Sequence, residues 1–366
     1  MSIIIFLIIL AILVLVHELG HFIVAKKSGI RVDEFGLGFP PRLLAKKWGE
    51  TTYTLNAIPF GGFVKIFGED SHTESMSEED KSTSFCYKPK WVQALVLVAG
   101  VTFNMIFAWL VISLGFMIGL PTPTDYAGLG QVTNPHLVVT EVLINSPAQK
   151  AGLESGDKIL SLSSGHIVLK DETLTPENVQ HTISESKAKS VEVTYSRGQN
   201  PLVVVSITPS TDVVAGSRVI GIAMDMIGTL KLPIHLALIE GAKTTWYLTE
   251  STLIGLGGFL WNVVKFKSDF SQISGPVGIV SVVSQANALG FIYLLSLMAI
   301  ISINLAIINL LPFPALDGGR LLFVVIEAII RRPISPKFVR MTNTVGFALL
   351  IVLMIIVTGH DIFKLL

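Results

Sequence analysis

Residues 3–25 read IIIFLIILAILVLVHELGHFIVA, an apolar run interrupted only by His17, Glu18 and His21. A helix of about 20 residues crosses the hydrocarbon core of a bilayer, so this run is long enough to span it. A secretory signal peptide is the alternative, but it needs a basic segment ahead of the apolar one, and Met1-Ser2 supplies no basic side chain. We therefore predict that residues 3–25 form a membrane-spanning helix with three ionisable side chains.

The composition of the whole chain also indicates a membrane protein. Of its 366 residues, 51% are hydrophobic and only 15% are charged, which leaves too few charged side chains to cover a water-facing surface. The 27 basic and 27 acidic residues balance, so no net field attracts nucleic acid, and we expect no nucleic-acid partner. The single cysteine, Cys86, excludes a disulfide within the chain and any cysteine pair for metal binding or redox chemistry.

Three further uncharged runs are candidates for membrane spans: residues 91–120, 291–311 and 341–359. Lysine and arginine are frequent between the first and second spans and again between the third and fourth, and loops of this kind stay in the cytoplasm. The sequence therefore predicts a multi-pass membrane protein in contact with the lipid bilayer. Both termini and residues 121–290 are expected outside the cytoplasm.

The stretch outside the membrane contains a different kind of pattern. Residues 137–208 consist of alternating apolar strands separated by polar turns, which is typical of a small folded domain. Residues 146–160, SPAQKAGLESGDKIL, resemble the strand, short helix and turn of a PDZ domain, although Ser163-Ser164-Gly165-His166 replaces the usual Asn-Gly turn. Any small β-rich domain is the alternative. PDZ domains bind extended peptides at a sheet edge, so the resemblance implies a peptide ligand.

Two other segments have a predicted place beside the membrane. Residues 51–66, TTYTLNAIPFGGFVKI, predict a hairpin-like pair of strands that is too apolar for a solvated loop. Extended backbone reaches membrane depth only where protein or a water-filled cavity satisfies its polar groups, so we expect a re-entrant β element beside an active site. Residues 234–267 predict helix lying on the outer membrane surface, and residues 274–279, SGPVGI, predict a loop or turn before the third span.

The interruption in the first span is the motif His-Glu-Leu-Gly-His, residues 17–21. On a helix, the i, i+4 spacing puts both imidazoles on one face with Glu18 one step away, an arrangement that suits zinc with the glutamate as general base. Two satisfied core histidines are the alternative. That reading is weaker because ionisable side chains inside a membrane span are costly and usually functional. We therefore predict that His17 and His21 bind zinc.

A catalytic zinc site takes three protein ligands and keeps a fourth position for water, so one more ligand must come from elsewhere. Asp317 is the better candidate than the scattered remaining histidines, and it lies in NLLPFPALDGG, residues 309–319. The orientation above used neither motif, yet it puts both at the cytoplasmic ends of their spans. Pro312 and Pro314 break the helix there and let the aspartate turn inward. A turn residue before two glycines is the alternative for Asp317.

Taken together, these segments resemble the site-2 protease family of intramembrane zinc metalloproteases. The likeness is greatest to bacterial members of the regulator-of-sigma-factor type, which carry an extracytoplasmic PDZ domain. The matching features run through the chain in the family's order: residues 17–21, 55–65, 146–160, 275–278 and 309–318. The chain departs from the better-known Gram-negative type in having room for one PDZ domain rather than two. Gating that requires a tandem pair therefore does not carry over.

The resemblance implies a zinc metalloendopeptidase that hydrolyses peptide bonds within or near the membrane-spanning segments of single-span membrane proteins. The resemblance also implies that the protein acts in the inner membrane of a bacterial cell. Its expected process is regulated intramembrane proteolysis, with anti-sigma factors or signal-peptide remnants as substrates. Zn²⁺ held by His17, His21 and Asp317 activates water in such a site, and Glu18 takes the proton of that water.

A helical substrate has to unwind before cleavage because its backbone is already hydrogen-bonded. The resemblance implies that residues 51–66 capture the unwound segment as an added strand and that Asn309 hydrogen-bonds its backbone near the metal. The expected substrate-binding residues are Asn309, Pro312, Pro314, Phe60, Gly61 and Gly62.

Two rival functions come from other classes of protein. A catalytically silent membrane scaffold could present a PDZ domain to peptides while the HExxH motif serves structure alone, and the zinc content of the purified protein separates this reading from the enzyme. A transporter with the buried histidines and aspartate as a proton relay ranks last because the chain lacks the repeat architecture common in transporters.

The predicted fold is a polytopic α-helical membrane protein with about four transmembrane helices, a re-entrant β element and an inserted α+β PDZ domain. We assign residues 1–120 to an N-terminal membrane region with the HExxH helix and 126–212 to the PDZ domain. Residues 213–290 form an interfacial helical region, and 291–366 a C-terminal membrane region with the Leu-Asp-Gly motif. The active site is expected near the cytoplasmic side and the PDZ domain outside.

Overall fold

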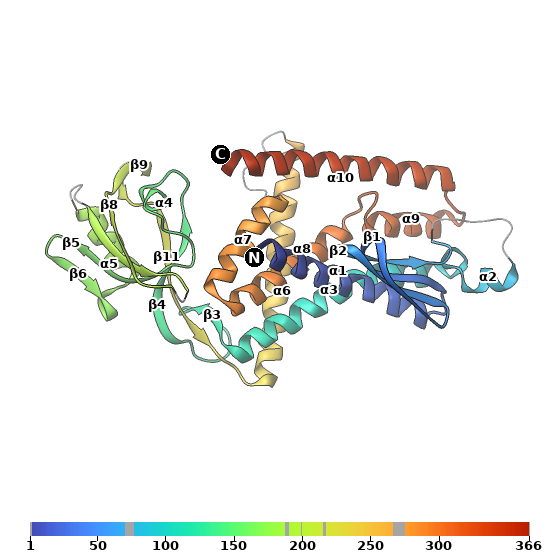
Figure 1. Ribbon diagram of the computed structural model, residues 1–366, viewed down its shortest axis with the longest axis horizontal. Helices are drawn as coiled ribbons and strands as arrows, with labels where there is room; N and C mark the ends of the chain where they lie inside the picture. Colours follow the sequence, from blue (N-terminus) through green and yellow to red (C-terminus); the bar gives the residue numbers. More distant parts are fainter. Residues whose placement is uncertain are drawn as a thin grey trace. The chain divides into compact units, whose positions relative to one another are not determined.

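Four long apolar helices form the membrane-crossing part of the chain in a computed structural model, which describes residues 2–69, 77–186, 190–198, 200–214, 217–265 and 275–365 (Figure 1). Each is long and apolar enough to cross a bilayer, and the four coincide with the predicted spans, as expected for a multi-pass membrane protein. The four helices are α1 (Ser2–Lys27), α3 (Lys90–Ile118), α8 (Phe291–Leu310) and α10 (Pro336–Leu365).

The fourth span differs in length from its prediction. The helix begins at Pro336 rather than at residue 341. Proline is favoured at the first position of a helix, and the charged side chains of Lys337 and Arg340 are accommodated where a helix leaves the membrane. The remaining helices are α2 (Glu78–Thr83), α4 (Pro147–Lys150), α5 (Pro176–Glu185), α6 (Ile234–Val264), α7 (Pro276–Leu289) and α9 (Asp317–Ile330), with 3₁₀ turns at Phe85–Tyr87 and Asp171–Thr173.

The chain divides into two compact units, each of which has its own core. The first contains residues 1–112, 241–284 and 296–366, and the second contains 113–240 and 285–295. In the first unit, a core cluster joins the end of α1, the start of α3 and α9 to the sheet of β1 (Val32–Trp48) and β2 (Thr51–Ile66). Its fully buried members include Ala25, Val32 and Val96. This cluster fixes the sheet against the helix that carries HExxH.

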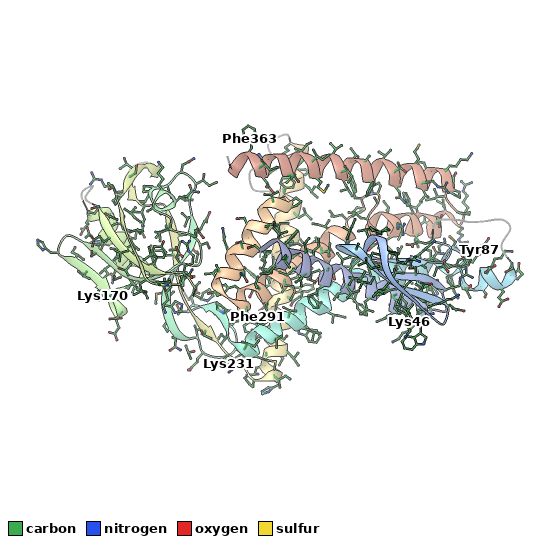
Figure 2. All side chains as sticks on the ribbon, in the orientation of Figure 1. Lys46, Tyr87, Lys170, Lys231, Phe291 and Phe363 are labelled. Atoms are coloured by element: carbon green, nitrogen blue, oxygen red, sulfur yellow. The ribbon has the colours of Figure 1, made fainter. Side chains whose placement is uncertain are left out.

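The β1–β2 sheet differs from the predicted hairpin. Residues 62–65 of β2 pair with 34–37 of β1, and those same β1 residues also pair with 52–55 of β2. The two halves of residues 51–66 are thus both extended, but they flank β1 instead of pairing with each other. The chain bends between them at Gly61, whose positive φ of 85° favours glycine. Lys46, labelled in Figure 2, lies in residues 44–48 of β1, which pair with residues 51–55 of β2.

The second unit contains a seven-stranded sheet with the order β3-β11-β4-β5-β7-β8, in which β6 pairs with β5. Its core is apolar and includes Leu137, Leu162 and Val193, with α5 packed on it through Val179 and Ile183. The strands are β3 (Leu120–Pro123), β4 (Thr133–Val142), β5 (Lys158–Ser164), β6 (Ile167–Lys170), β7 (Val191–Ser196), β8 (Val203–Ile207) and β11 (Ile222–Leu230), and β9 (Ser210–Val214) pairs separately with β10 (Ser217–Val219).

The boundary predicted at residue 212 is too early. Strand β11 lies beyond it, yet β11 pairs with β4 from Ile222 to Thr229 and with β3 from Ile227 to Leu230. Residues 222–230 therefore belong to the sheet, and the helical region begins only with α6 at Ile234. Pattern reading failed here because the partner of β11 lies about 80 residues earlier in the chain, where no local signal links the two strands.

The structure bears on two predictions about residues 234–279. One is the helix at 234–267, and the other is the loop at 274–279. Helix α6 is continuous from Ile234 to Val264, whereas Lys267 and Ser274 lie outside the described residues. The expectation of a loop at Pro276 is wrong, because Pro276 begins α7, where its missing N–H and fixed φ are tolerated. The side chain of Asp361 accepts a hydrogen bond of 2.8 Å from Gly278 N and so caps the first turn of α7.

A buried ion pair holds the turn after the helix α4 in the second unit. Asp157 has no exposed surface and accepts hydrogen bonds from Arg197 Nε and Nη2 at 2.7 and 2.8 Å. Arg197 also donates to the carbonyl of Gly152 at 2.7 Å, and its hydrogen bond with Asp157 raises the pKa of the guanidinium above its ordinary value. The pair fixes the segment that the sequence analysis compared with a PDZ domain.

Candidate metal centre

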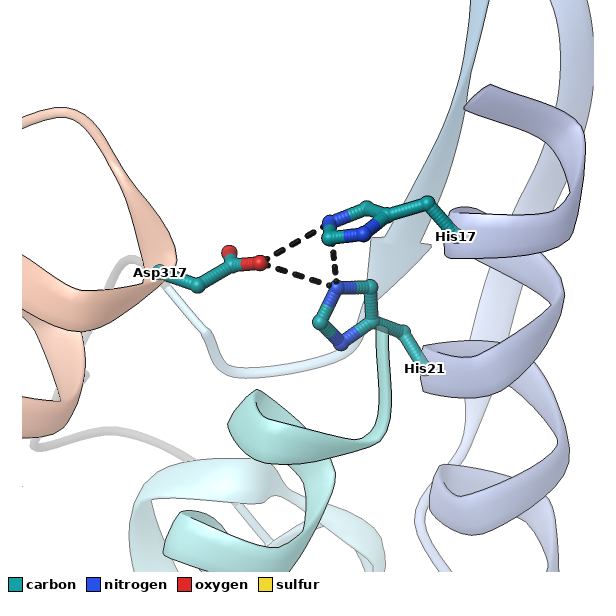
Figure 3. Close-up of side chains that lie close together, drawn as sticks. All are labelled: His17, His21 and Asp317. Carbon is teal, nitrogen blue, oxygen red and sulfur yellow. Dashed lines mark hydrogen bonds and ion pairs between the residues drawn. The ribbon is translucent and has the colours of Figure 1, made fainter. Parts of the chain in front are cut away.

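Three side chains from two distant parts of the chain meet at one point. His17 and His21 project from one face of α1, and Asp317 is the first residue of α9 (Figure 3). Asp317 Oδ2 lies 2.9 Å from His17 Nε2 and 3.2 Å from His21 Nε2, and the two Nε2 atoms are 3.2 Å apart. The sequence separation of about 300 residues shows that the fold, rather than local structure, creates this cluster.

The loop before α9 aims Asp317 at the histidines. A Cβ at Gly318 would lie within 2.5 Å of the carbonyl groups of Leu310 and Leu311, and one at Gly319 would collide with the carbonyl of Phe313. The two glycines therefore let the first turn of α9 fold tightly onto the loop. The helix N-cap, Leu316, makes no side-chain capping bond, and the carboxylate of Asp317 points at the imidazoles. This geometry argues against reading Asp317 as a simple turn residue.

Helix α3 sets the orientation of the second histidine. His21 Nδ1 lies 2.8 Å from the carbonyl oxygen of Val96, an acceptor that requires a proton on Nδ1. The Nε2 atom of His21 then faces Asp317 and His17, on the side where a metal ion would bind. Both imidazoles are 6% exposed, so they are held in a protein environment rather than in bulk water.

A close approach between α1 and α3 makes room for the two rings. A Cβ on Gly20 would lie 2.5 Å from the carbonyl oxygen of Ala99, so the backbones nearly touch there. A Cβ on Gly100 would lie 2.6 and 2.8 Å from ring atoms of His17 and would also overlap His21 Nε2. The sequence analysis missed Gly100, because a glycine in an apolar span gives no signal that separates a functional site from ordinary helix packing.

Glu18 opens onto a cavity of about 660 Å³ together with two of the three metal-binding candidates. His21 and Asp317 line one part of the cavity, and residues 63–66 of β2 line another. The same cavity extends to Glu69 and Arg320, which form an ion pair between the end of β2 and the first turn of α9. A carboxylate, two candidate ligands and a strand edge thus share one space large enough for a short peptide segment.

The predicted substrate-binding residues fall into two groups. Gly61 and Gly62 lie against α1, since a Cβ on Gly62 would be 3.7 Å from Glu18 Cγ and one on Gly61 would be 3.4 Å from Val14. The side chain of Phe60 lies outside the described part of the structure. Asn309 ends α8 half-buried, but it is absent from the described lining of the cavity.

The two prolines occupy the loop between α8 and α9. Pro312 is exposed, and Pro314 packs so closely against α10 that a Cβ on Gly346 would lie 2.7 Å from its carbonyl oxygen. Neither proline is among the described residues that line the cavity with Glu18. Their observed contacts therefore support the loop, and direct contact with a substrate stays a prediction.

The donor set fits zinc. Two imidazole nitrogens and one carboxylate oxygen lie within 4.8 Å of one another. Donors at zinc–ligand distances of about 2.0–2.1 Å in a tetrahedral site are roughly 3.3 Å apart, which is close to the separations found here. Burial opposes ionisation of Asp317, but hydrogen bonds with His17 and His21 outweigh it and hold the pKa of the carboxyl below its ordinary value. An anionic carboxylate is the form that binds a metal ion.

Comparisons with known proteins identify the class. Four membrane-crossing helices with a buried cluster of two histidines and an aspartate define a membrane metalloprotein, and the model of peptidase family M50 matches residues 5–353. A protein of Clostridium perfringens with a zinc metalloprotease name is 37% identical over 350 residues, covering 96% of this chain and 95% of that protein. A similarly named protein of Nostoc is 33% identical over 356 residues, covering 96% and 93%.

The alignment with another relative extends over nearly the whole length of both proteins. The zinc metalloprotease RasP of Bacillus licheniformis is 28% identical over 440 residues, which include 100% of this chain and 99% of that protein. The chain therefore belongs to peptidase family M50, the site-2 protease family. It is a metalloprotease with Zn²⁺ as cofactor, and its apolar helices embed it in a membrane.

We predict that Gly100→Ala disrupts the metal centre. The added methyl group occupies the space of the His17 and His21 rings, so zinc affinity should fall at least tenfold and proteolysis should fall with it. Gly255→Ala on α6 is the control, because a Cβ there meets nothing within 4 Å. Zinc content after dialysis against graded chelator buffers measures the effect. Equal zinc retention in both variants contradicts the proposed steric role of Gly100.

Proposed function

We propose that this protein is an intramembrane zinc endopeptidase in which His17, His21 and Asp317 hold the metal and Glu18 is the catalytic base. The observation that carries the proposal is the meeting of these three donors within 4.8 Å, with Glu18 on the same cavity. Family membership supplies the metal and the class of reaction. A scaffold with a purely structural HExxH motif gives no reason for Asp317 to turn away from capping its own helix.

The residues divide the work of hydrolysis among themselves. Zinc in such a site supplies Lewis acidity, which polarises a peptide carbonyl and acidifies an attacking water. Glu18 accepts the proton of the water and delivers it to the leaving amine as the C–N bond breaks. The carbonyl of Val96 holds the ring of His21, and the absence of a side chain at Gly100 leaves space for both imidazoles.

The substrate segment binds as an added strand along residues 62–66. These residues pair with β1 on one side and line the cavity beside Glu18 with Phe63, Val64 and Lys65. Backbone donors and acceptors at such an edge give an unwound peptide the hydrogen bonds that it loses on leaving its helix. Gly61 and Gly62 keep this edge close to α1. Asn309, at the end of α8, is the proposed polar contact for the substrate backbone.

The second unit is a single PDZ domain that binds an extended peptide. Strand β11 pairs with β4 from Ile222 onward but with β3 only from Ile227, so its first residues have one side free of strand pairing in the described sheet. Helix α5 contacts both β11 and β10. A free strand edge next to a helix is the arrangement that accepts a peptide by strand addition.

The topology follows from the distribution of basic residues. Residues 28–89 and 311–335 connect successive spans and carry most of the flanking lysines and arginines, so these connections lie in the cytoplasm of a bacterial cell. The PDZ domain is then outside and the metal centre near the cytoplasmic side. Such an enzyme cleaves single-span proteins, among them anti-sigma factors or signal-peptide remnants in regulated intramembrane proteolysis.

We predict opposite effects on zinc for two carboxyl variants. Glu18→Gln should lower cleavage of a single-span substrate at least a thousandfold while zinc content stays near wild type, because the residue is a base and not a ligand. Asp317→Asn should lower both, because it removes an anionic ligand. Leu19→Ala, at an exposed position between the motif residues, controls for damage to α1. Full turnover by pure Glu18→Gln protein rules out the mechanism.

The proposed topology predicts which cysteines react from outside the cell. On a Cys86→Ser background, His166→Cys in the exposed turn after β5 should react with an impermeant thiol reagent in intact cells. Ser335→Cys, exposed before α10, should react only after the membrane is opened. If only the Ser335→Cys protein is labelled in intact cells, the protein has the opposite orientation in the membrane.

If the PDZ domain excludes bulky ectodomains, its removal should widen the range of substrates. Thr124 N donates to Met226 O at 2.9 Å, so residues 125–225 can be replaced by a short glycine-serine turn without separating β3 from the end of β11. A substrate with a small ectodomain should be cleaved at nearly the wild-type rate and one with a large ectodomain should become cleavable. Equal loss of cleavage for both substrates points to recruitment instead of exclusion.

A further inference from the structure

Asn104 of α3 lies beside the metal centre, on the side of His17 away from Asp317. Its side chain has no exposed surface, and its Nδ2 atom is 3.3 Å from His17 Nδ1. Its Oδ1 atom is buried without a hydrogen-bond partner among the described residues. A buried amide with one unsatisfied oxygen next to an imidazole needs a reason, because a polar atom that is removed from water without a hydrogen-bond partner destabilises the fold.

The position of the proton on the ring of His17 determines which atom of the Asn104 amide can form a hydrogen bond with Nδ1. In the structure His17 Nε2 faces the carboxylate of Asp317, which only accepts, so the proton is on Nε2 and Nδ1 accepts from the amide of Asn104. A metal ion on Nε2 uses the lone pair of that atom, and the proton of the neutral ring is then on Nδ1. The amide nitrogen of Asn104 cannot accept this proton, whereas Oδ1 can.

We propose that Asn104 is the positioning residue of His17: its Oδ1 accepts the Nδ1–H of the metal-bound ring. This inference rests on the proposed zinc ligands. The amide reaches that state by a half-turn about its last bond, because its oxygen and nitrogen have nearly the same shape. Ser302 Oγ donates 2.8 Å to the backbone carbonyl of Asn104 and ties this turn of α3 to α8.

The two histidines then have equivalent supports from a single helix. His21 Nδ1 donates to the carbonyl of Val96. In the proposed metal-bound state, His17 Nδ1 donates to Oδ1 of Asn104, two turns further along α3, whose amide already lies beside that atom. Gly100 lies midway and leaves space for both rings. Metal-binding histidines regularly have such an acceptor on the second nitrogen, and its loss weakens metal binding about 10–100-fold.

Two substitutions at residue 104 separate an acceptor from a donor and from simple packing. Asn104→Leu keeps the size but removes both functions, and zinc affinity should fall about 10–100-fold. Asn104→Asp keeps only the acceptor, and its affinity should stay within about threefold of wild type or rise, as in carboxylate–histidine–zinc triads. The full-length proteins are compared in detergent by zinc content at equilibrium with graded chelator buffers.

The control is another buried amide of the same helix. Gln93 donates to the carbonyls of Cys86 and Lys88 and contacts neither histidine in the described structure, so Gln93→Leu should leave zinc affinity unchanged. The visible absorption of Co²⁺-substituted protein provides a second readout, since a displaced His17 alters the ligand field: the Asn104→Asp spectrum should match wild type and the Asn104→Leu spectrum should not.

Each outcome has a distinct meaning. Equal weakening in Asn104→Asp and Asn104→Leu overturns the inference, because the amide nitrogen or the shape then matters. Unchanged affinity in Asn104→Leu overturns it as well. If Asn104→Leu does not fold, the affinity and Co²⁺ spectrum of Asn104→Asp decide alone. Wild-type protein that binds no zinc refutes the proposed function itself, and this result is independent of residue 104.

Discussion

The backbone contact between α1 and α3 is the constraint on which the rest of the structure depends. Gly20 lies against the carbonyl of Ala99, and only because the two helices approach this closely can a carbonyl of α3 reach the ring of His21. The same approach forbids any side chain at residue 100. Asp317 can then complete the cluster from the opposite side, with α9 held by two glycines that fold its first turn onto the preceding loop.

Much of the membrane part could be predicted because its signals are local. The four spans follow from the lengths of uncharged runs, and the pairing of HExxH with Asp317 followed from the distribution of basic residues, which put both motifs at the same depth. Carboxylate, imidazole and spacing are visible in the letters of the sequence. The supports of the site are not, since Val96 acts through its backbone carbonyl and Gly100 through its lack of a side chain, features that any packed helix could contain.

The β elements were harder for a related reason. Strand partners are chosen by the whole fold, so residues 51–66 were correctly seen as extended but were wrongly paired with each other. The role of residues 32–48 was not recognised, since prolines, glycines and charges interrupt any alternation there. In the same way, β11 joins strands from far earlier in the chain, which moved the edge of the second unit past residue 212.

The edge formed by residues 62–66 has a consequence for how a substrate is recognised. A membrane helix presents a new side chain to a given face about every 3.6 residues, whereas a strand alternates its side chains with a period of two. In the proposed binding mode, a segment added beside 62–66 directs every second side chain toward the same wall of the cavity. The side chains that distinguish a good substrate should therefore recur at every second residue around the cleaved bond. Residues with this spacing do not lie on one face of the substrate's intact helix.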